Sequence, residues 1–111
     1  MQYRTSISIL LITAAVVAPL RATIFSTVGG VVHDPNHRPI SGAQVLLRAM
    51  DSDYRQDVST ADDGSFEFPS VALGQYTIDV TRQGFAPQQQ FLNILSNTVP
   101  VLHFQLQLAG H

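Results

Sequence analysis

Residues 29–47 read GGVVHDPNHRPISGAQVLL, and this stretch decides the fold. Val28, just before this stretch, and Gly30 and Val32 within it are spaced two apart, so an extended chain points them to one face. The Asp-Pro-Asn sequence at 34–36 then ends the strand, because proline fixes φ and lacks an N–H while Asp and Asn bond their own backbone in turns. We therefore expect a strand followed by a proline-marked turn.

A second strand is expected after Ser41-Gly42, which marks a bulge or a tight approach, since glycine adopts backbone angles that other residues avoid. Val45, Leu47 and Ala49 share one face of this strand. Leu46 breaks the alternation, which predicts that the strand is covered on both faces.

The rest of the chain repeats short strands separated by turn signals about every ten residues. Tyr76, Ile78 and Val80 alternate with polar residues, as in a half-buried strand, and Pro69 to Gly74 are expected to connect it to the strand before. The pattern predicts an all-β sandwich with little helix. Further strands are expected at 54–60, 66–68, 88–95 (a weaker strand at a sheet edge) and 102–108.

Four short motifs occur in order along this pattern. They are Gly30-x-Val32-x-Asp34 with Pro39-Ile40-x-Gly42-Ala43-x-Val45, Thr60-x-x-Asp63-Gly64-x-Phe66-x-Phe68, Leu73-Gly74-x-Tyr76, and Gly84-Phe85. Together they resemble the carboxypeptidase regulatory-like domain, over about Thr27 to Leu108; Leu73 stands where that family usually has proline. The resemblance implies a seven-stranded Greek-key β-sandwich of transthyretin (prealbumin) type, related to the B-type repeats of bacterial collagen adhesins.

Residues 1–22 are expected to be a cleavable signal peptide. Arg4 precedes an apolar run at 7–18, and Leu20-Arg21-Ala22 offers a cleavage point. The alternative is a membrane anchor, but twelve helical residues span about 18 Å and a hydrocarbon core is about 30 Å thick. We therefore expect export to the periplasm, the outer membrane or the outside of a bacterial cell, with no span in the mature chain. The expected domain is 23–108, with a tail at 109–111.

Composition excludes several classes of function. With 111 residues, 45% hydrophobic and 13% charged, the chain is expected to form one folded domain. The absence of cysteine excludes disulfides, thiolate metal sites and a cysteine nucleophile. All six basic residues are arginine, so the lysine–asparagine crosslink of some B-type repeats cannot form. Removal of the signal peptide would leave four arginines against eight acidic residues, which argues against nucleic-acid binding.

The histidines do not form a sequence motif for a metal. His33 and His37 are four apart, a spacing that suits a metal on a helix, but they bracket a turn and have no third ligand nearby in sequence. We interpret them as solvated turn residues. His103 is expected to face outward between Leu102 and Phe104, and His111 ends the sequence.

The aspartates offer a second alternative, a calcium site, in which five of them would gather around the ion. The D-x-[DN]-x-[DN]-G loop pattern is absent, and turn chemistry accounts for Asp63-Gly64 without an ion. No metal, cofactor or ligand-binding residue is therefore assigned. The five residues are Asp51, Asp53, Asp57, Asp62 and Asp63.

Catalysis is not expected. Ser41 and Ser65 lack a G-x-S-x-G elbow, and Glu67 has no carboxylate partner at a fixed spacing. The transthyretin-like hydrolases of ureide metabolism carry a histidine–arginine set and a C-terminal signature that this chain lacks.

Two functions are left open. The resemblance implies a non-catalytic, exported envelope module that binds polysaccharide or a receptor or peptidase partner domain, as at the N-terminus of TonB-dependent outer-membrane receptors. The alternative is a structural spacer or docking domain that pairs through edge strands. For that role we expect a contact patch of Leu46, Leu92 and Ile94, which break the alternation.

Overall fold

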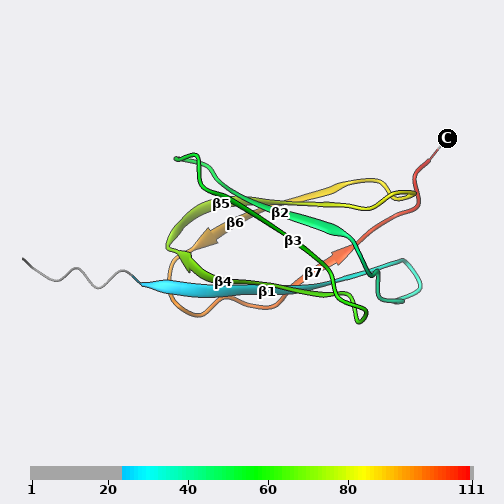
Figure 1. Ribbon diagram of the computed structural model, residues 1–111, viewed down its shortest axis with the longest axis horizontal. Helices are drawn as coiled ribbons and strands as arrows, with labels where there is room; N and C mark the ends of the chain where they lie inside the picture. The colour runs from blue at the N-terminus through cyan, green and yellow to red at the C-terminus, as the bar shows by residue number, and fades with distance from the viewer. Residues whose placement is uncertain (1–23, 111) are drawn as a thin grey trace, which may run out of the picture.

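The computed structural model describes residues 24–110, which form two layers of β-sheet (Figure 1). One sheet has the strand order β4-β1-β7 and the other β3-β2-β5-β6. The prediction of an all-β, seven-stranded sandwich is confirmed, whereas the expected signal peptide lies outside the described residues. The strands are β1 (Phe25–His33), β2 (Gln44–Ala49), β3 (Arg55–Ser59), β4 (Ser65–Ala72), β5 (Gly74–Thr81), β6 (Gln88–Ile94) and β7 (Leu102–Gln105).

The core lies between the two sheets because each strand alternates inward apolar and outward polar side chains. In β5, Tyr76, Ile78 and Val80 are buried as predicted, and in β2 the buried residues are Val45 and Leu47. All strand pairs are antiparallel except β1 with β7, which run parallel. No helix in the described part of the chain is long and apolar enough to cross a membrane.

Two expectations about local structure are wrong. The segment Pro69 to Gly74 was expected to be a connection, but β4 continues through Pro69 to Ala72. Proline is tolerated there because β4 is an edge strand with a bulge at Pro69 and Ser70, and both kinds of position accept a residue without an N–H. The strand that contains Leu46 was expected to be covered on both faces. Leu46 is half-buried on the outer face, where its strand neighbours are Asp57 and Asp79.

Aspartates organise two of the turns. Asp34 accepts hydrogen bonds from the backbone N–H groups of Asn36 (2.8 Å) and Arg38 (2.9 Å). Asp63 accepts from the Ser65 hydroxyl (2.6 Å) and its N–H (3.0 Å). These bonds favour the charged form of each carboxyl and therefore lower its pKa. The main cause of the lowered pKa is the Arg38 N–H at Asp34 and the Ser65 hydroxyl at Asp63.

These lowered pKa values predict a loss of stability in acid. Each carboxyl has a folded pKa below its ordinary value of 3.8, so its stabilising contribution is complete above that value and disappears as pH falls through the folded pKa. Urea denaturation at about pH 3 and at pH 7 measures this loss. Between pH 7 and pH 3 the free energy of unfolding should fall less in Asp63→Asn than in the unmodified protein. Ser65→Ala keeps the carboxyl and removes the hydroxyl donor, so it should reduce the loss partially. If both variants lost as much unfolding free energy between pH 7 and pH 3 as the unmodified protein, this account would be contradicted.

Candidate binding surfaces

Among the hollows on the described surface of the sandwich, one lies at the end where β1 begins and two lie at the opposite end. We name them the aromatic, histidine and arginine hollows, with volumes of about 340, 360 and 480 Å³. All three fall near the lower end of the range of about 300–1,000 Å³ that holds small ligands. Their chemistry, not their size, therefore decides between them.

The aromatic hollow is built by the start of β1, the β2–β3 loop and the β4–β5 corner, which meet at the left end in Figure 1. Phe25 and Tyr54 expose 52% and 43% of their surface, so two aromatic rings are presented to solvent. Asp51 adds a carboxylate, and two serines add hydroxyls. The full lining is Phe25, Ala49, Asp51, Ser52, Tyr54, Ser70, Ala72, Leu73 and Tyr76.

A β-bulge shapes the wall of this hollow. Val28 pairs with Phe68 and Ser26 with Val71, so Pro69 and Ser70 together face the single residue Thr27. Ser70 has a φ of 58°, which is uncommon for any residue but glycine. Bulges and such backbone angles concentrate where a strand must redirect a side chain next to a binding site.

Tyr76 forms the most buried part of the aromatic hollow. Tyr76 is 5% exposed, its ring lies edge-on to Tyr54 at 6.3 Å between centroids, and its hydroxyl donates to the Ala72 carbonyl at 2.7 Å. Burial raises the pKa of Tyr76 above its ordinary value, and the nearby Tyr54 and Asp51 raise it further. The arrangement can therefore accept a ligand with an apolar face and hydroxyl groups, which would stack on the rings and donate to Asp51.

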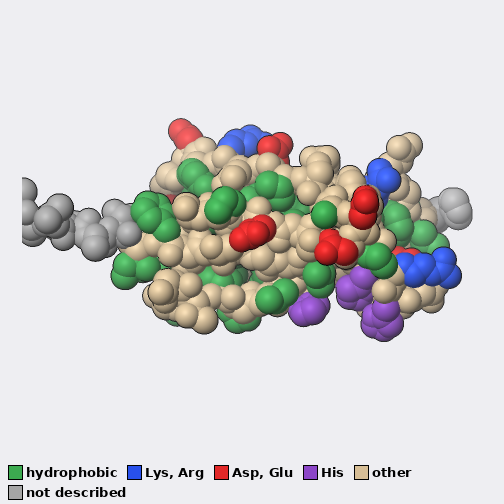
Figure 2. Space-filling model, turned by 60° about the horizontal axis from the view of Figure 1, so that its bottom comes forward, with side chains coloured by type: hydrophobic (Ala, Val, Ile, Leu, Met, Phe, Trp, Pro, Cys, Tyr) green, Lys and Arg blue, Asp and Glu red, His purple; other side chains and the backbone are tan. Residues whose placement is uncertain are grey.

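The histidine hollow brings together residues that the sequence keeps apart. His33 and His37 lie with ring centroids 5.2 Å apart, and His103 and Asp63 line the same depression. Parallel pairing of β1 with β7 places His103 opposite Val31, which is why sequence spacing did not reveal it. Figure 2 shows the histidine side chains gathered on one part of the surface. His103 is exposed, as predicted.

Two side chains of the histidine hollow already have hydrogen-bond partners. The Nδ1 of His33 lies 2.9 Å from the Asp34 carbonyl oxygen and fits as its donor, and Asp63 is engaged by Ser65. Within residues 24–110, no group of three or more His, Cys, Asp or Glu side chains is placed to hold a metal ion. The aspartates considered for calcium are also divided, because Asp51 lines the aromatic hollow and Asp63 the histidine hollow.

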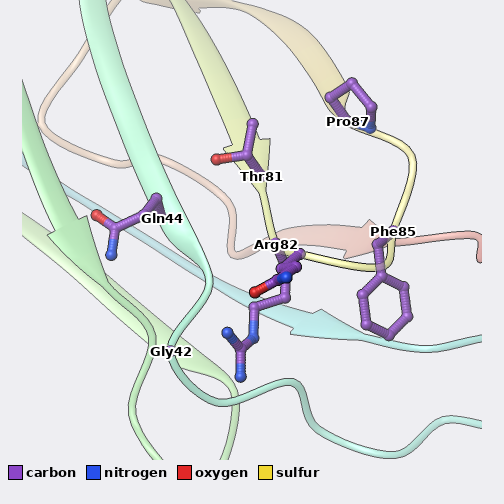
Figure 3. Close-up of a pocket in the computed structure, with 7 residues that line it drawn as sticks. Gly42, Gln44, Thr81, Arg82, Phe85 and Pro87 are labelled. Atoms are coloured by element: carbon purple, nitrogen blue, oxygen red, sulfur yellow. The ribbon is translucent and has the colours of Figure 1, made fainter. Parts of the chain in front are cut away.

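The arginine hollow contains Arg82, which extends toward Gly42, and the ring of Phe85 projects from a point further along the same loop (Figure 3). Its remaining lining consists of Gln44, Thr81, Gln83 and Pro87. A single arginine at an open surface attracts an anion weakly, since water and salt screen the charge. This hollow therefore offers less specific chemistry than the aromatic hollow.

The serines considered as nucleophiles serve the turns. Ser41 donates to Asp62 at 3.3 Å, and Ser65 donates to Asp63. Glu67 is exposed on β4, opposite Gly29. Neither the Ser41–Asp62 pair nor the Ser65–Asp63 pair resembles a nucleophile with an adjacent base.

The predicted contact patch is wrong. Leu92 and Ile94 are 8% and 2% exposed and belong to the core, because residues two apart in a strand share a face and here that face is inward. The exposed apolar side chain of β6 is Phe91, at 53%. Sequence reasoning missed Phe91, as it missed Phe25 and Ser70. Phe25 lies three residues after the end of the expected signal region, and the strain at Ser70 has no sequence signature.

Comparison with known proteins identifies the same family as the motifs. The family model of the carboxypeptidase regulatory-like domain matches residues 27–107. Serine-aspartate repeat-containing protein F of Staphylococcus epidermidis is 33% identical over 60 residues, which cover 53% of this chain and 4% of that protein. The chain thus spans a small part of this relative.

Solved structures share the fold at low sequence identity. The Bacillus anthracis TIE protein gives a TM-score of 0.66 at 15% identity, over 77% of this chain and 17% of that one. A streptococcal ancillary pilin gives 0.60 at 13% identity, over 80% and 31% of the two chains. A candidate carbohydrate-binding protein of Pseudomonas aeruginosa gives 0.58 at 11% identity, over 77% and 89%. These likenesses show a shared β-sandwich.

Proposed function

Because this chain belongs to the carboxypeptidase regulatory-like domain family, we propose that it is a non-catalytic, exported accessory domain that binds polysaccharide of the bacterial cell envelope. The aromatic hollow carries this proposal. Its exposed rings of Phe25 and Tyr54 offer stacking surfaces for the apolar face of a sugar ring, and Asp51 offers an acceptor for sugar hydroxyls. The similar fold of a candidate carbohydrate-binding protein supports the same ligand class.

Polysaccharide binding is expected to depend on the rings of the hollow. Titration of polysaccharide isolated from the host envelope, followed by calorimetry or amide chemical shifts, should show binding that weakens about tenfold or more in Tyr54→Ala, because truncating an aromatic anchor costs about 2 kcal/mol or more. Tyr54→Phe keeps the ring and should bind nearly as well as the unmodified protein. Asp51→Asn should weaken binding by removing the carboxylate.

Phe91→Ala is the matched control, since it removes an exposed ring of similar accessibility outside the hollow. It should leave binding unchanged. Equal losses in the Tyr54 and Phe91 variants, or no binding by the unmodified protein, would exclude the aromatic hollow as a polysaccharide site.

We also propose that residues 1–22 direct export and that the module serves at the front of a TonB-dependent receptor. The sequence supports this with Arg4, the apolar run at 7–18 and a motif-bearing domain directly after it. Mass spectrometry of the exported protein should find Thr23 as its first residue. A reading frame that continues beyond His111 into a plug and barrel would support the receptor role, and a stop codon there would oppose it.

The second candidate is the structural one, a docking domain that pairs through an edge strand. The observation that favours it is the free edge of β6, which has neither charge nor proline. Protection of β6 amides from hydrogen exchange when an envelope protein is added would support docking, and unchanged exchange would oppose it.

A further inference from the structure

The two sheets leave four edge strands, and three of them carry features that oppose pairing with another strand. β4 contains the Pro69–Ser70 bulge and Glu67. β3 has five residues that include Arg55 and Asp57, and β7 has only four. Proline, bulges, charges and shortness all protect a sheet edge. β6 has seven residues and none of these protections.

The sequence around β6 also lacks charged residues, and the carboxylate of Asp79, which faces Gln89 from β5, is paired with Arg48. From Gln83 to Leu102 the sequence contains no Asp, Glu, Lys, Arg or His, although residues 24–110 carry eight acidic residues against four arginines. Two copies of an acidic protein repel one another over most of their surfaces. An uncharged edge allows identical copies to approach at one place, and the occupant that fits it best is a second copy of this chain.

We propose that β6 pairs antiparallel with β6 of a second copy to form a symmetric dimer with a continuous eight-stranded sheet. This inference rests on the second proposed function, pairing through an edge, and does not involve the aromatic hollow. A two-fold axis makes such an interface self-complementary. The register that pairs all seven residues joins Gln88 to Ile94 of the other copy and places the two Phe91 rings directly opposite each other.

This register also gives the exposed side chains partners. Phe91, Gln89 and Asn93 share the outer face, opposite in direction to the buried Leu92 and Ile94. Across the axis Phe91 meets Phe91, an aromatic cross-strand pair of a kind that stabilises sheets. Gln89 already donates its amide N–H to Asp79 at 2.7 Å, so its amide oxygen is the group that can accept from Asn93 of the other copy. The interface is small, so we expect a dissociation constant of about micromolar or weaker.

Cysteine trapping tests the register, because the chain has no cysteine of its own. In the proposed dimer the two residues 91 lie about 4.5–5.5 Å apart between Cα atoms, within disulfide range. Phe91→Cys should therefore form a covalent dimer on mild oxidation. Asn93→Cys is the control: in the dimer its two cysteines would be offset by four residues along the strands, about 13 Å, so it should not form the covalent dimer.

Charge tests the interface without a covalent bond. Phe91→Lys places two like charges opposite each other and should raise the dimer dissociation constant at least about tenfold in sedimentation equilibrium. Gln75→Lys adds the same charge to the same outer face, on the interior strand β5 opposite Asn93, and should leave dimerisation unchanged.

A monomer at all concentrations, or equal crosslinking of the residue 91 and residue 93 variants, would overturn self-pairing. Polysaccharide binding should persist in Phe91→Lys, because residue 91 lies outside the aromatic hollow. Loss of dimerisation therefore tests the β6 interface, and loss of polysaccharide binding tests the aromatic hollow. Docking on another protein is also separate, since it would protect β6 amides only when that protein is added.

Discussion

Gly30→Ala is expected to destabilise the domain by about 3 kcal/mol, because a side chain at this position has no space. A Cβ atom there would lie 2.5 Å from Cζ of Phe66 and 2.7 Å from the carbonyl oxygen of Leu102. The Phe66 ring cannot easily withdraw, since it packs against Phe68 and Phe104 at centroid distances of 5.9 and 6.1 Å. The Leu102 oxygen belongs to the backbone of β7, so relief would require β1 and β7 to separate.

The neighbouring glycine supplies the control. A Cβ atom at Gly29 would lie 3.5 Å from the Phe66 carbonyl oxygen, an ordinary contact. Gly29→Ala should therefore be neutral or stabilise by roughly 0.5 kcal/mol, since alanine restricts the unfolded chain more than glycine. Urea denaturation of both variants measures the difference. Phe66→Leu combined with Gly30→Ala should recover part of the loss, and equal destabilisation by the two alanines would contradict the close-approach argument.

The strands were predictable because their signal is local. Tyr76, Ile78 and Val80 in β5 alternate with polar residues, Val45 and Leu47 in β2 are two positions apart, and the structure buries all five. A period of two is a property of each strand alone and does not require knowledge of its partners.

The errors arose where a residue's meaning depends on its place in the sheet. Pro69 predicted a connection because proline cannot donate to a ladder, yet an edge strand has one side where no donor is needed. Leu92 and Ile94 were assigned to a surface because the sequence does not say which face of β6 is inward. The face became clear only from pairing with β5.

The hollows were not predictable, because each joins segments that are distant in sequence. The aromatic hollow combines Phe25, Tyr54 and Ser70 from three different elements. The histidine hollow depends on the parallel pairing of β1 with β7, which places His103 beside residues about seventy positions earlier. Spacing rules detect clusters within one element, and none of these clusters lies within one.

Thr60→Val is expected to cost about 3 kcal/mol, although the two side chains have nearly the same shape. The Thr60 hydroxyl is buried, donates to the Ile40 carbonyl at 2.6 Å and accepts from the Ala43 N–H at 2.9 Å. Valine would leave both backbone groups without this partner, at about 1–3 kcal/mol for each buried group. This hydroxyl fixes the turn before β2 to the end of β3, which gives a physical reason for threonine at the start of the Thr60-x-x-Asp63-Gly64 motif.

Thr60→Ser separates the hydroxyl from the methyl group. Serine keeps both hydrogen bonds and loses one methyl, so it should cost only about 1 kcal/mol. Urea denaturation gives the free energies, and hydrogen exchange at the Ala43 amide should accelerate in the valine variant well before global unfolding. A valine variant more stable than the serine variant would show that packing of the methyl group, and not the hydroxyl, holds this corner of the sandwich.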